Sequence, residues 1–277
     1  MTAATEAAGL FGPGSVSWRI DREVVVLAGG SCALLMQAAH PVVAAGVAEH
    51  SSYATDPFGR LLRTLVTSYE FVFGSLAEAD AALRRVNAIH AGVRGRLPGT
   101  GQAYAAMDPE ALLWVHATLV DTALRVYSRF VSPLTPSDEQ AYYVESSRVA
   151  QVLGVRPSDL PPTIADVRAW MTEMIASRRV HVTPAARNIA RTVLYPTRFP
   201  PRLAWDAAHL VSLSALPPAL RRQYGIRWSA RRERGVEWLA RASRVVVPWL
   251  PSPVRHAPQA RAADRRVRRA RQAAGGS

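Results

Sequence analysis

The chain has 277 residues, of which 49% are hydrophobic, and this fraction is enough to build a sizeable core. It contains a single cysteine, Cys32, which excludes an intramolecular disulfide framework and a thiolate metal cluster. A reducing cytoplasm is therefore the expected compartment. No basic segment followed by an apolar stretch opens the sequence, so we expect no signal peptide.

The formal net charge of +13 is unevenly distributed along the chain. Residues 1–170 hold 13 arginines and 16 acidic residues, whereas residues 171–277 hold 21 arginines and 5 acidic residues. There is no lysine, a usage typical of a GC-rich genome. Because its charge is not balanced, the C-terminal third is expected to be attracted to anionic surfaces such as phosphate, acidic lipid or an acidic partner.

The first long apolar segment, residues 24–48, contains no charged residue. Pro41 divides it into pieces of about 16 and 7 residues, each shorter than the roughly 20 that a membrane-spanning helix needs. We therefore predict a buried central helix that breaks at His40 and Pro41.

Helix start signals dominate the middle of the chain. They consist of Asp or Thr followed by proline, or of Ser or Thr with an acidic residue three positions later. These signals occur at Asp56, Ser75, Asp108, Thr135, Thr163 and Thr183, and two further helices are expected near Arg202 and Ser229. No segment shows strand alternation bounded by hairpin turns. The sequence predicts a single all-α domain of about nine or ten helices.

The C-terminal part allows two interpretations. Residues 231–250 place Val236 and Ala240 at helical spacing beside many arginines. This pattern fits a helix lying on a membrane surface, but we favour an ordinary last core helix with a solvated basic face. We assign residues 1–250 to the helical domain. Residues 251–277 are rich in Arg, Ala and Pro, and we expect them to be disordered or a loosely docked helix.

Several kinds of catalytic site are absent from the sequence. There is no nucleophile elbow, phosphate-binding glycine loop or dinucleotide fingerprint. Cys32 lies in an apolar run and is expected to be an inert buried thiol. A di-iron bundle needs paired Glu-x-x-His elements, and zinc sites need close ligand pairs; the chain has neither.

A haem needs less: one neutral imidazole on an apolar helix face, a slot between helices and cations for its propionates. Three histidines are candidates, although such a residue is more often an ordinary core residue than a ligand. His90 follows an apolar stripe, His116 lies among leucines and valines, and His40 stands at the predicted helix break. The sequence contains no Cys-x-x-Cys-His, so a haem would be held without thioether links.

The helix expected after Asp56 carries Arg60, Arg63 and Thr64 on one face, at positions i, i+3 and i+4. Such side chains can donate hydrogen bonds to dioxygen, to a water or to a haem propionate. The alternative is a solvated basic face, although positive charge near a helix start opposes the helix dipole.

Three runs of sequence, LLMQAAHPVVAAGVAEHSSYATDPFGRLLRTL, RRVNAIHAGVRG and YAAMDPEALLWVHATLVDTAL, occur in this order. With them the chain resembles, over roughly residues 18–200, the oxygenase family named for MpaB, which includes the latex-clearing rubber oxygenases. The resemblance implies a globin-like helical fold around a haem b. It also implies reaction of dioxygen with an apolar substrate such as an alkene, a terpenoid or a lipid.

The resemblance also suggests roles for individual residues. The Arg-x-x-Lys-Thr stretch on the distal side of the haem in rubber oxygenases matches Arg60 to Thr64, except that Arg63 replaces the lysine. A guanidinium is not a plausible iron ligand. The proximal histidine maps best onto His90, with His116 as the alternative. The proposed catalytic glutamate has no clear counterpart, and Glu49 and His40 are candidates only by proximity.

Three hypotheses follow. The first is a haem-dependent oxygenase in which His90 binds the iron while Arg60 and Thr64 polarise dioxygen. The second is a haem carrier or sensor of the same fold without catalysis. The third is weak binding of a membrane surface or anionic partner through the basic C-terminal third, which would make a cytoplasmic protein peripheral to the membrane. No sequence pattern supports specific nucleic-acid binding.

Overall fold

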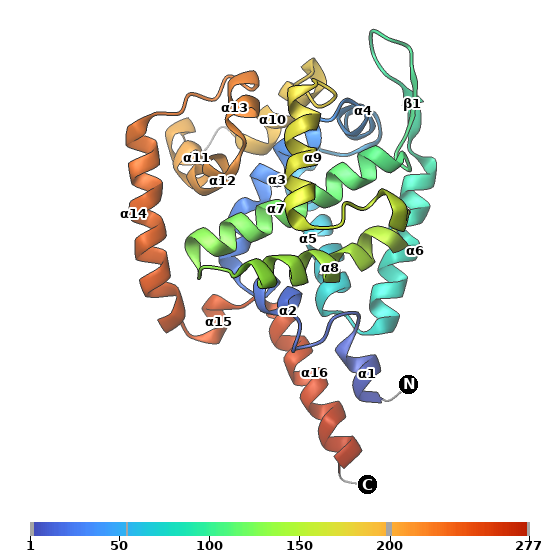
Figure 1. Ribbon diagram of the computed structural model, residues 1–277, viewed down its shortest axis with the longest axis vertical. Coiled ribbons are helices and arrows are strands. Elements are labelled where there is room, and N and C mark those ends of the chain that lie inside the picture. Colours follow the sequence, from blue (N-terminus) through green and yellow to red (C-terminus); the bar gives the residue numbers. More distant parts are fainter. Residues whose placement is uncertain (1–2, 54, 198–200, 276–277) are drawn as a thin grey trace.

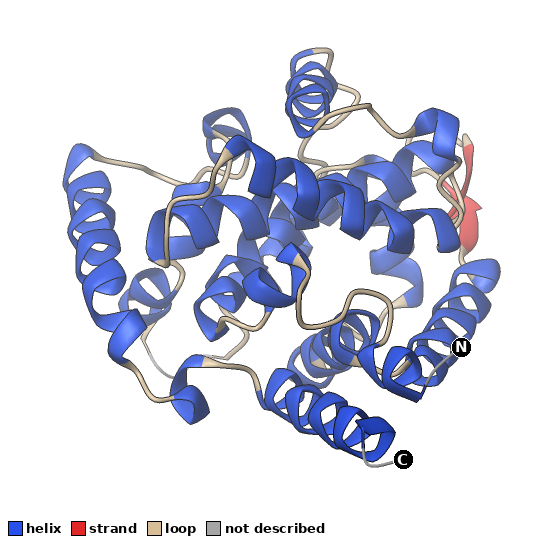
Figure 2. Ribbon diagram, turned by 60° about the horizontal axis from the view of Figure 1, so that its bottom comes forward, coloured by secondary structure: helices blue, strands red, loops and turns tan. Residues whose placement is uncertain are grey.

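The protein is described by a computed structural model covering residues 3–53, 55–197 and 201–275. Within these ranges the chain folds almost wholly into helices, which confirms the predicted single all-α domain (Figures 1 and 2). The α-helices are α1 Ala3–Ala8, α2 Val16–Asp21, α3 Gly30–Ala38, α4 Pro41–His50, α5 Pro57–Phe73, α6 Leu76–Gly92, α7 Pro109–Phe130, α8 Pro136–Val152, α9 Ile164–Ala176, α10 Pro184–Leu194, α11 Arg202–Ala208, α12 Leu210–Ala215, α13 Pro218–Gln223, α14 Ala230–Val246, α15 Ser252–Arg255 and α16 Pro258–Gly275.

Short 3₁₀ helices and one hairpin complete the described structure. The 3₁₀ helices are η1 Val24–Gly29, η2 Pro157–Asp159 and η3 Val247–Trp249. The antiparallel strands β1 Arg94–Arg96 and β2 Ala103–Ala105 were not predicted, because three residues are too few to show alternation. The predicted number of helices was also too low, because several helices span less than two turns and show no readable period. The long helices begin at the predicted caps: Asp56, Ser75, Asp108, Thr135, Thr163, Thr183 and Ser229 each accept a backbone hydrogen bond.

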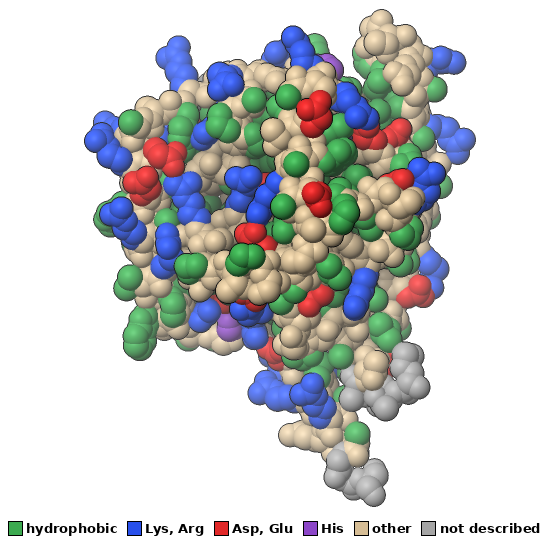
Figure 3. Space-filling view, in the orientation of Figure 1, with side chains coloured by type: hydrophobic (Ala, Val, Ile, Leu, Met, Phe, Trp, Pro, Cys, Tyr) green, Lys and Arg blue, Asp and Glu red, His purple; other side chains and the backbone are tan. Residues whose placement is uncertain are grey.

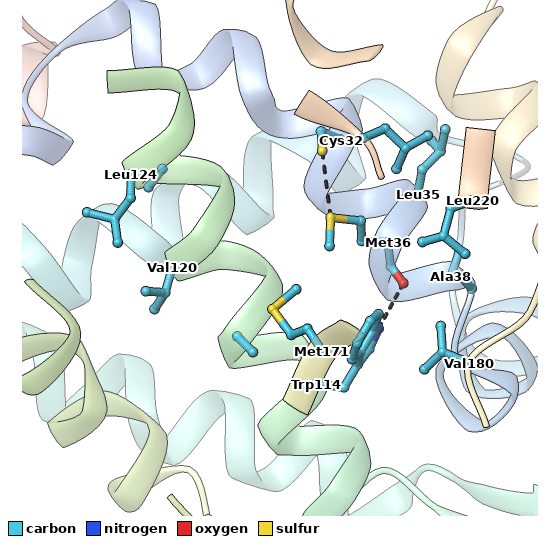
Figure 4. Packing of buried hydrophobic residues seen from close by; sticks show 14 of the residues in the cluster. Cys32, Leu35, Met36, Ala38, Trp114, Val120, Leu124, Met171, Val180 and Leu220 are labelled. Carbon is cyan, nitrogen blue, oxygen red and sulfur yellow. Dashed lines mark hydrogen bonds between the residues drawn. The ribbon is translucent and has the colours of Figure 1, made fainter. Parts of the chain in front are cut away.

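Helix α7 is the centre of the molecule (Figure 1). Of its 22 residues 14 are buried, and it contacts η1, α2, α3, α8, α9, α12 and α14. Trp114 is fully buried, and its indole Nε1 donates a hydrogen bond of 2.8 Å to the carbonyl oxygen of Met36 in α3 (Figure 4). Such a bond is needed because a buried polar group without a partner is costly. Helices α3 and α7 thereby form one apolar core.

The apolar segment 24–48 forms η1, α3 and α4. As predicted, the helix breaks at His40, which becomes the N-cap residue of α4, with Pro41 in its first turn. Cys32, Leu35 and Met36 of α3 are fully buried against α7 and α10 (Figure 4). In the described part of the chain, no single helix meets the length and hydropathy needed to span a bilayer. The two segments Val24–Ala38 and Pro41–His50 meet these criteria when they are taken together, but the chain bends by 104° between them. The match rests on length and composition alone.

The C-terminal segment is not disordered; of the two expected alternatives it is the docked helix, and its docking is specific rather than loose. It forms α15 and α16, and α16 packs against α1 and α5 (Figure 1). Alanines and one valine form its buried face, and Asp264 accepts hydrogen bonds from the Trp18 indole (3.2 Å) and the Arg22 guanidinium (2.7 Å). Small side chains make a weak hydrophobic signal in sequence, yet they allow close helix packing and these two polar contacts fix the helix.

The face of α14 that contains Val236 and Ala240 is buried against Val126 and Phe130 of α7. The favoured interpretation of a last core helix is thus correct for this face. A membrane contact through this stripe is wrong, because α7 already covers it.

The junction of η1 and α3 provides a test of the packing against α7. A Cβ atom at Gly29 would lie 2.7 Å from Thr122 Cγ2 and 2.9 Å from Val126 Cγ2, whereas at Gly30 it would meet nothing within 4 Å. We expect Gly29→Ala to lower the free energy of unfolding by about 1–3 kcal/mol through overpacking. Gly30→Ala, the matched control, should be neutral or stabilising by up to about 1 kcal/mol. Urea unfolding of both variants checks this, and equal stabilities would contradict the packing described here.

Candidate functional site

Helices α5 and α6 form an antiparallel hairpin that is packed at one end and open at the other. Near the connecting turn, Phe71, Phe73, Ala79 and Ala82 are buried, and the ring of Phe73 meets that of Trp18 edge-on at 5.1 Å. Among the residues whose side chains are described, none before Tyr69 on α5 or after Ala82 on α6 is buried. The hairpin packs on α1, α2 and α16 but makes no extensive contact with α7. Its open end is therefore only partly covered.

His90 lies at this open end. It is half-buried, and its Nδ1 atom is inaccessible to water and has no hydrogen-bond partner. Burial lowers the pKa of His90, so the imidazole is neutral at pH 7, which is the form that binds metals. Leu83, Val86 and Val93, which share its face, are likewise only half-buried. The stripe that the sequence predicted to be buried is thus only partly covered.

Arg60 and Thr64 lie at the same end of the hairpin. An ion pair between Arg85 of α6 and Glu70 of α5 fixes the register of the two helices. His90 lies five residues from Arg85 toward the open end of α6, and Thr64 lies six residues from Glu70 toward the open end of α5. Arg60 is half-buried, and its Nε donates a hydrogen bond of 2.7 Å to Ser51 Oγ. Burial, followed by the nearby Arg63, lowers its pKa.

Arg63 and Thr64 are both exposed. The Arg63 guanidinium donates to Asp56 Oδ2 (3.1 Å) and Ser52 Oγ (3.0 Å), which holds it on the loop before α5. Thr64 Oγ1 donates to the Arg60 carbonyl oxygen at 2.9 Å. Arg60 is therefore the cation of this trio whose terminal Nη atoms have no protein partner in the described structure.

His116 lies on α7, apart from the hairpin. Its Nε2 atom is buried without a hydrogen-bond partner, and burial lowers its pKa to about 4. Its ring centroid lies 6.2 Å from that of Tyr143 on α8. Leu119 lies three residues after His116, so the two side chains are neighbours on the same side of the helix. Leu119 is 48% exposed, although most of α7 is buried. This part of α7 is therefore covered by α8 at His116 but left open at Leu119.

The structure places His40 in a different environment. It is only 4% exposed, and neither ring nitrogen has a hydrogen-bond partner. Burial is the main cause that lowers its pKa to about 4; Asp108 raises the pKa, while Arg179 and His181 lower it. Its Nε2 atom lies 3.6 Å from Glu110, but this is no ion pair at pH 7 because the imidazole is neutral; Glu110 pairs with Arg179.

Glu49 is held at the other end of α4. Its carboxylate accepts a hydrogen bond of 2.6 Å from the Tyr104 hydroxyl. Burial, followed by this hydrogen bond and the charge of Glu49, raises the pKa of Tyr104 to about 12. The adjacent His50 ring lies 3.2 Å from the Arg94 carbonyl oxygen. The ends of α4 and α6 thus meet at the β-hairpin, close to the start of α5 through Ser51. His40, at the opposite end of α4, has no described contact with this group.

Two features were missed by the sequence analysis. Asn87 Oδ1 is buried without a hydrogen-bond partner, while its amide nitrogen donates to the Val152 carbonyl oxygen of α8 at 3.4 Å. Asn87 stands three residues before His90, so helical spacing could have singled it out. The exposure of Leu119 gave no sequence signal, because it depends on which helices fail to cover α7.

The unpartnered imidazoles bear on which cofactor fits. Within residues 3–53, 55–197 and 201–275, no group of three or more His, Cys, Asp or Glu side chains could hold a metal ion. A haem needs only one protein ligand and a partly apolar slot. The open end supplies an unpartnered neutral imidazole as a ligand and a guanidinium with free donors as a partner for a propionate.

The chain belongs to the family described as "ER-bound oxygenase mpaB/B'/Rubber oxygenase, catalytic domain", which it matches over residues 18–245. This result confirms the family resemblance noted in the sequence, and it supports oxygenase activity in general. No curated protein and no solved structure matches the chain.

The burial of His40 predicts a pH dependence of stability. Its pKa is about 4 in the folded protein and about 6.5 in the unfolded chain, so the unfolded chain takes up the proton first as the pH falls. Stability is unaffected above about pH 6.5 and falls toward pH 4, by roughly 1.4 kcal/mol per unit of pKa difference. His40→Gln should remove this slope.

The measurement is the difference in unfolding free energy between the wild type and His40→Gln across pH 4–8. The difference is needed because Asp21 also makes stability depend on pH. Burial raises its pKa to about 7, so its contribution to stability falls as the pH rises, opposite to that of His40. Asp21 is present in both proteins, so its contribution cancels in the difference. A difference that does not change with pH would contradict a neutral, buried His40.

Proposed function

We propose that this protein is a haem b-dependent oxygenase that reacts dioxygen with an apolar substrate at the open end of the α5–α6 hairpin. The observation that carries the proposal is the neutral imidazole of His90, whose buried Nδ1 atom has no hydrogen-bond partner. The helix face on which His90 lies is only partly covered. Buried polar atoms without a partner are rare in folded proteins, and a bound cofactor, ion or water commonly satisfies them.

His90 would hold the iron of the haem, with His116 on α7 as the alternative. A bound haem would supply the iron at which dioxygen is activated. Burial keeps both imidazoles neutral, so that no proton has to be displaced before they bind a metal. His90 fits the role of ligand better than His116, because it lies in the same hairpin as Thr64 and at the same level along it. His116 lies on α7, outside the hairpin.

Arg60 would donate charge-assisted hydrogen bonds within the site. Its Nε is fixed by Ser51, which orients the guanidinium and leaves its Nη atoms free for a propionate or a polar oxygen of the reactants. Arg63 is already bound to Asp56 and Ser52, and a guanidinium offers no lone pair to iron. We therefore assign no ligand role to Arg63.

An apolar substrate is favoured by the side chains that remain uncovered. Leu119 on α7 is 48% exposed, and Leu62 and Val66 on α5 are 62% and 38% exposed. Leu62 and Val66 continue the face of α5 on which Tyr69 and Phe73 are buried nearer the turn. Exposed apolar surface is typical of a site for an apolar ligand. His40, buried beside Asp108 and Glu110, has no contact that supports a catalytic role here.

The absorption spectrum of protein produced with a supply of haem tests the proposal. We expect a Soret band and about one haem per chain, and we expect His90→Ala to lose both. His256→Ala, which changes an imidazole beside Ser252 and Glu23, is the control and should keep them. Loss of the band in His116→Ala instead would transfer the ligand role to α7. No Soret band in the wild type would end the proposal.

Oxygen uptake with squalene as a model alkene separates an oxygenase from a haem carrier. Arg60→Ala should retain its Soret band but lower the rate by roughly tenfold or more, because a hydrogen bond from a charged donor contributes about 1.5–3 kcal/mol. Arg63→Ala, three residues away and already bound to the loop, should change the rate by less than about threefold. Equal rates in the two variants would contradict the role of Arg60, and a haem protein that consumes no dioxygen would favour a carrier.

A further inference from the structure

Helix α14 carries an outward stripe that the proposed oxygenase site does not use. Arg231, Arg234, Trp238, Arg241 and Val245 are spaced by three or four residues, so they share one side of the helix. All five are exposed. They lie opposite Val236 and Ala240, the buried residues of α14. The helix is therefore apolar on its inner face and mixed cationic and apolar on its outer face.

The apolar part of this stripe widens where α14 ends. Trp249 in η3 is 86% exposed, more than any other large hydrophobic residue of the described structure, and Trp238 is 70% exposed. Val245, Val246 and Val254 are 67%, 52% and 59% exposed. In Figure 3 hydrophobic side chains gather at the lower left, at the end of α14, with arginines above them. We call these three valines and two tryptophans, with Arg231, Arg234 and Arg241, the α14 face.

The arginines of the α14 face are free to bind an external anion. Arg231, Arg234 and Arg241 make no hydrogen bond or ion pair with the residues that the structure describes. By contrast, Arg232 on the inner side of α14 bonds to Asp206 and to the Arg227 carbonyl oxygen. The only exposed acidic residue on α14 is Glu237. The outer positive charge of this helix is therefore not neutralised within the protein.

We propose that the α14 face docks on the surface of an anionic phospholipid bilayer. Tryptophan rings are amphipathic and partition to the boundary between headgroups and acyl chains, where the neighbouring valines would also be buried. The three arginines would lie at the level of the lipid phosphates, whose negative charge complements them. The helix would lie flat on the surface rather than cross it. This docking does not depend on whether the protein binds haem.

A bilayer explains the composition of the surface better than other anionic partners. A nucleic acid would account for the arginines, but it offers no apolar medium for Val245, Val246 and Val254. An acidic protein partner would neutralise the same charges, and its binding would not require a lipid. Because each partner would respond differently to salt and to lipid composition, one set of binding experiments distinguishes them.

The test is co-sedimentation of the full-length protein with vesicles of phosphatidylcholine alone or of phosphatidylcholine with 30% phosphatidylglycerol. We expect binding that increases at least about tenfold with the anionic lipid and that is weakened, but not abolished, by 0.5 M salt. Brominated acyl chains should quench part of the tryptophan fluorescence. Replacing both Trp238 and Trp249 by Phe should remove this quenching, while the circular dichroism spectrum stays unchanged.

A matched pair of double variants supplies the control. Arg241→Gln with Val245→Ser changes two positions four residues apart on the α14 face. Arg148→Gln with Val144→Ser makes the same changes four residues apart on the exposed side of α8. We expect the first pair to lower vesicle binding about tenfold and the second to leave it unchanged. Equal effects, equal binding to both vesicles, or binding to duplex DNA in place of vesicles would overturn the proposal.

Discussion

The structure depends on the need to cover α7 on all sides. A helix with 14 of its 22 residues buried can exist in water only if other elements surround it. The break at His40 and Pro41 turns the apolar segment 24–48 so that α3 lies on α7 and α4 leads away from it. The bond from Trp114 to the Met36 carbonyl oxygen then joins the two helices. Most later helices are arranged around this pair.

The candidate site lies where that covering is incomplete. The α5–α6 hairpin is fixed near its turn by Trp18, α1 and α16, but its other end does not pack closely on α7. The unpartnered imidazole of His90 lies at that end of the hairpin, and the unpartnered imidazole of His116 and the exposed Leu119 lie on α7. Both ring nitrogens of His40 are also buried without a partner. What sets His90 and Leu119 apart is the incompletely covered surface around them.

The sequence predicted the long helices because their starts are chemically explicit. Asp56, Ser75, Asp108 and Thr163 each form the capping bond that their side chains allow. The short helices, the β-hairpin and the docking of α16 could not be predicted, because they depend on tertiary contacts such as Asp264 with Trp18.

The site was predicted with similar limits. The sequence named His90, Arg60 and Thr64, and the structure brings them to one end of a hairpin. It could not show that Arg63 is bound to Asp56 and Ser52, or that His40 is buried away from that end. The first fact depends on how the loop before α5 lies on Arg63, and the second on how the start of α7 packs against His40. The α14 face was also hidden, because the sequence pointed to the stripe that α7 covers.

The most direct test of the account is hydrogen–deuterium exchange of the protein before and after reconstitution with haem. If the cofactor lies between the α5–α6 hairpin and α7, exchange should slow at residues 59–68 and 83–93. It should stay unchanged at the packed end of the hairpin and along α14. Haem binding that protects some other region, and leaves residues 83–93 exchanging as before, would contradict the account.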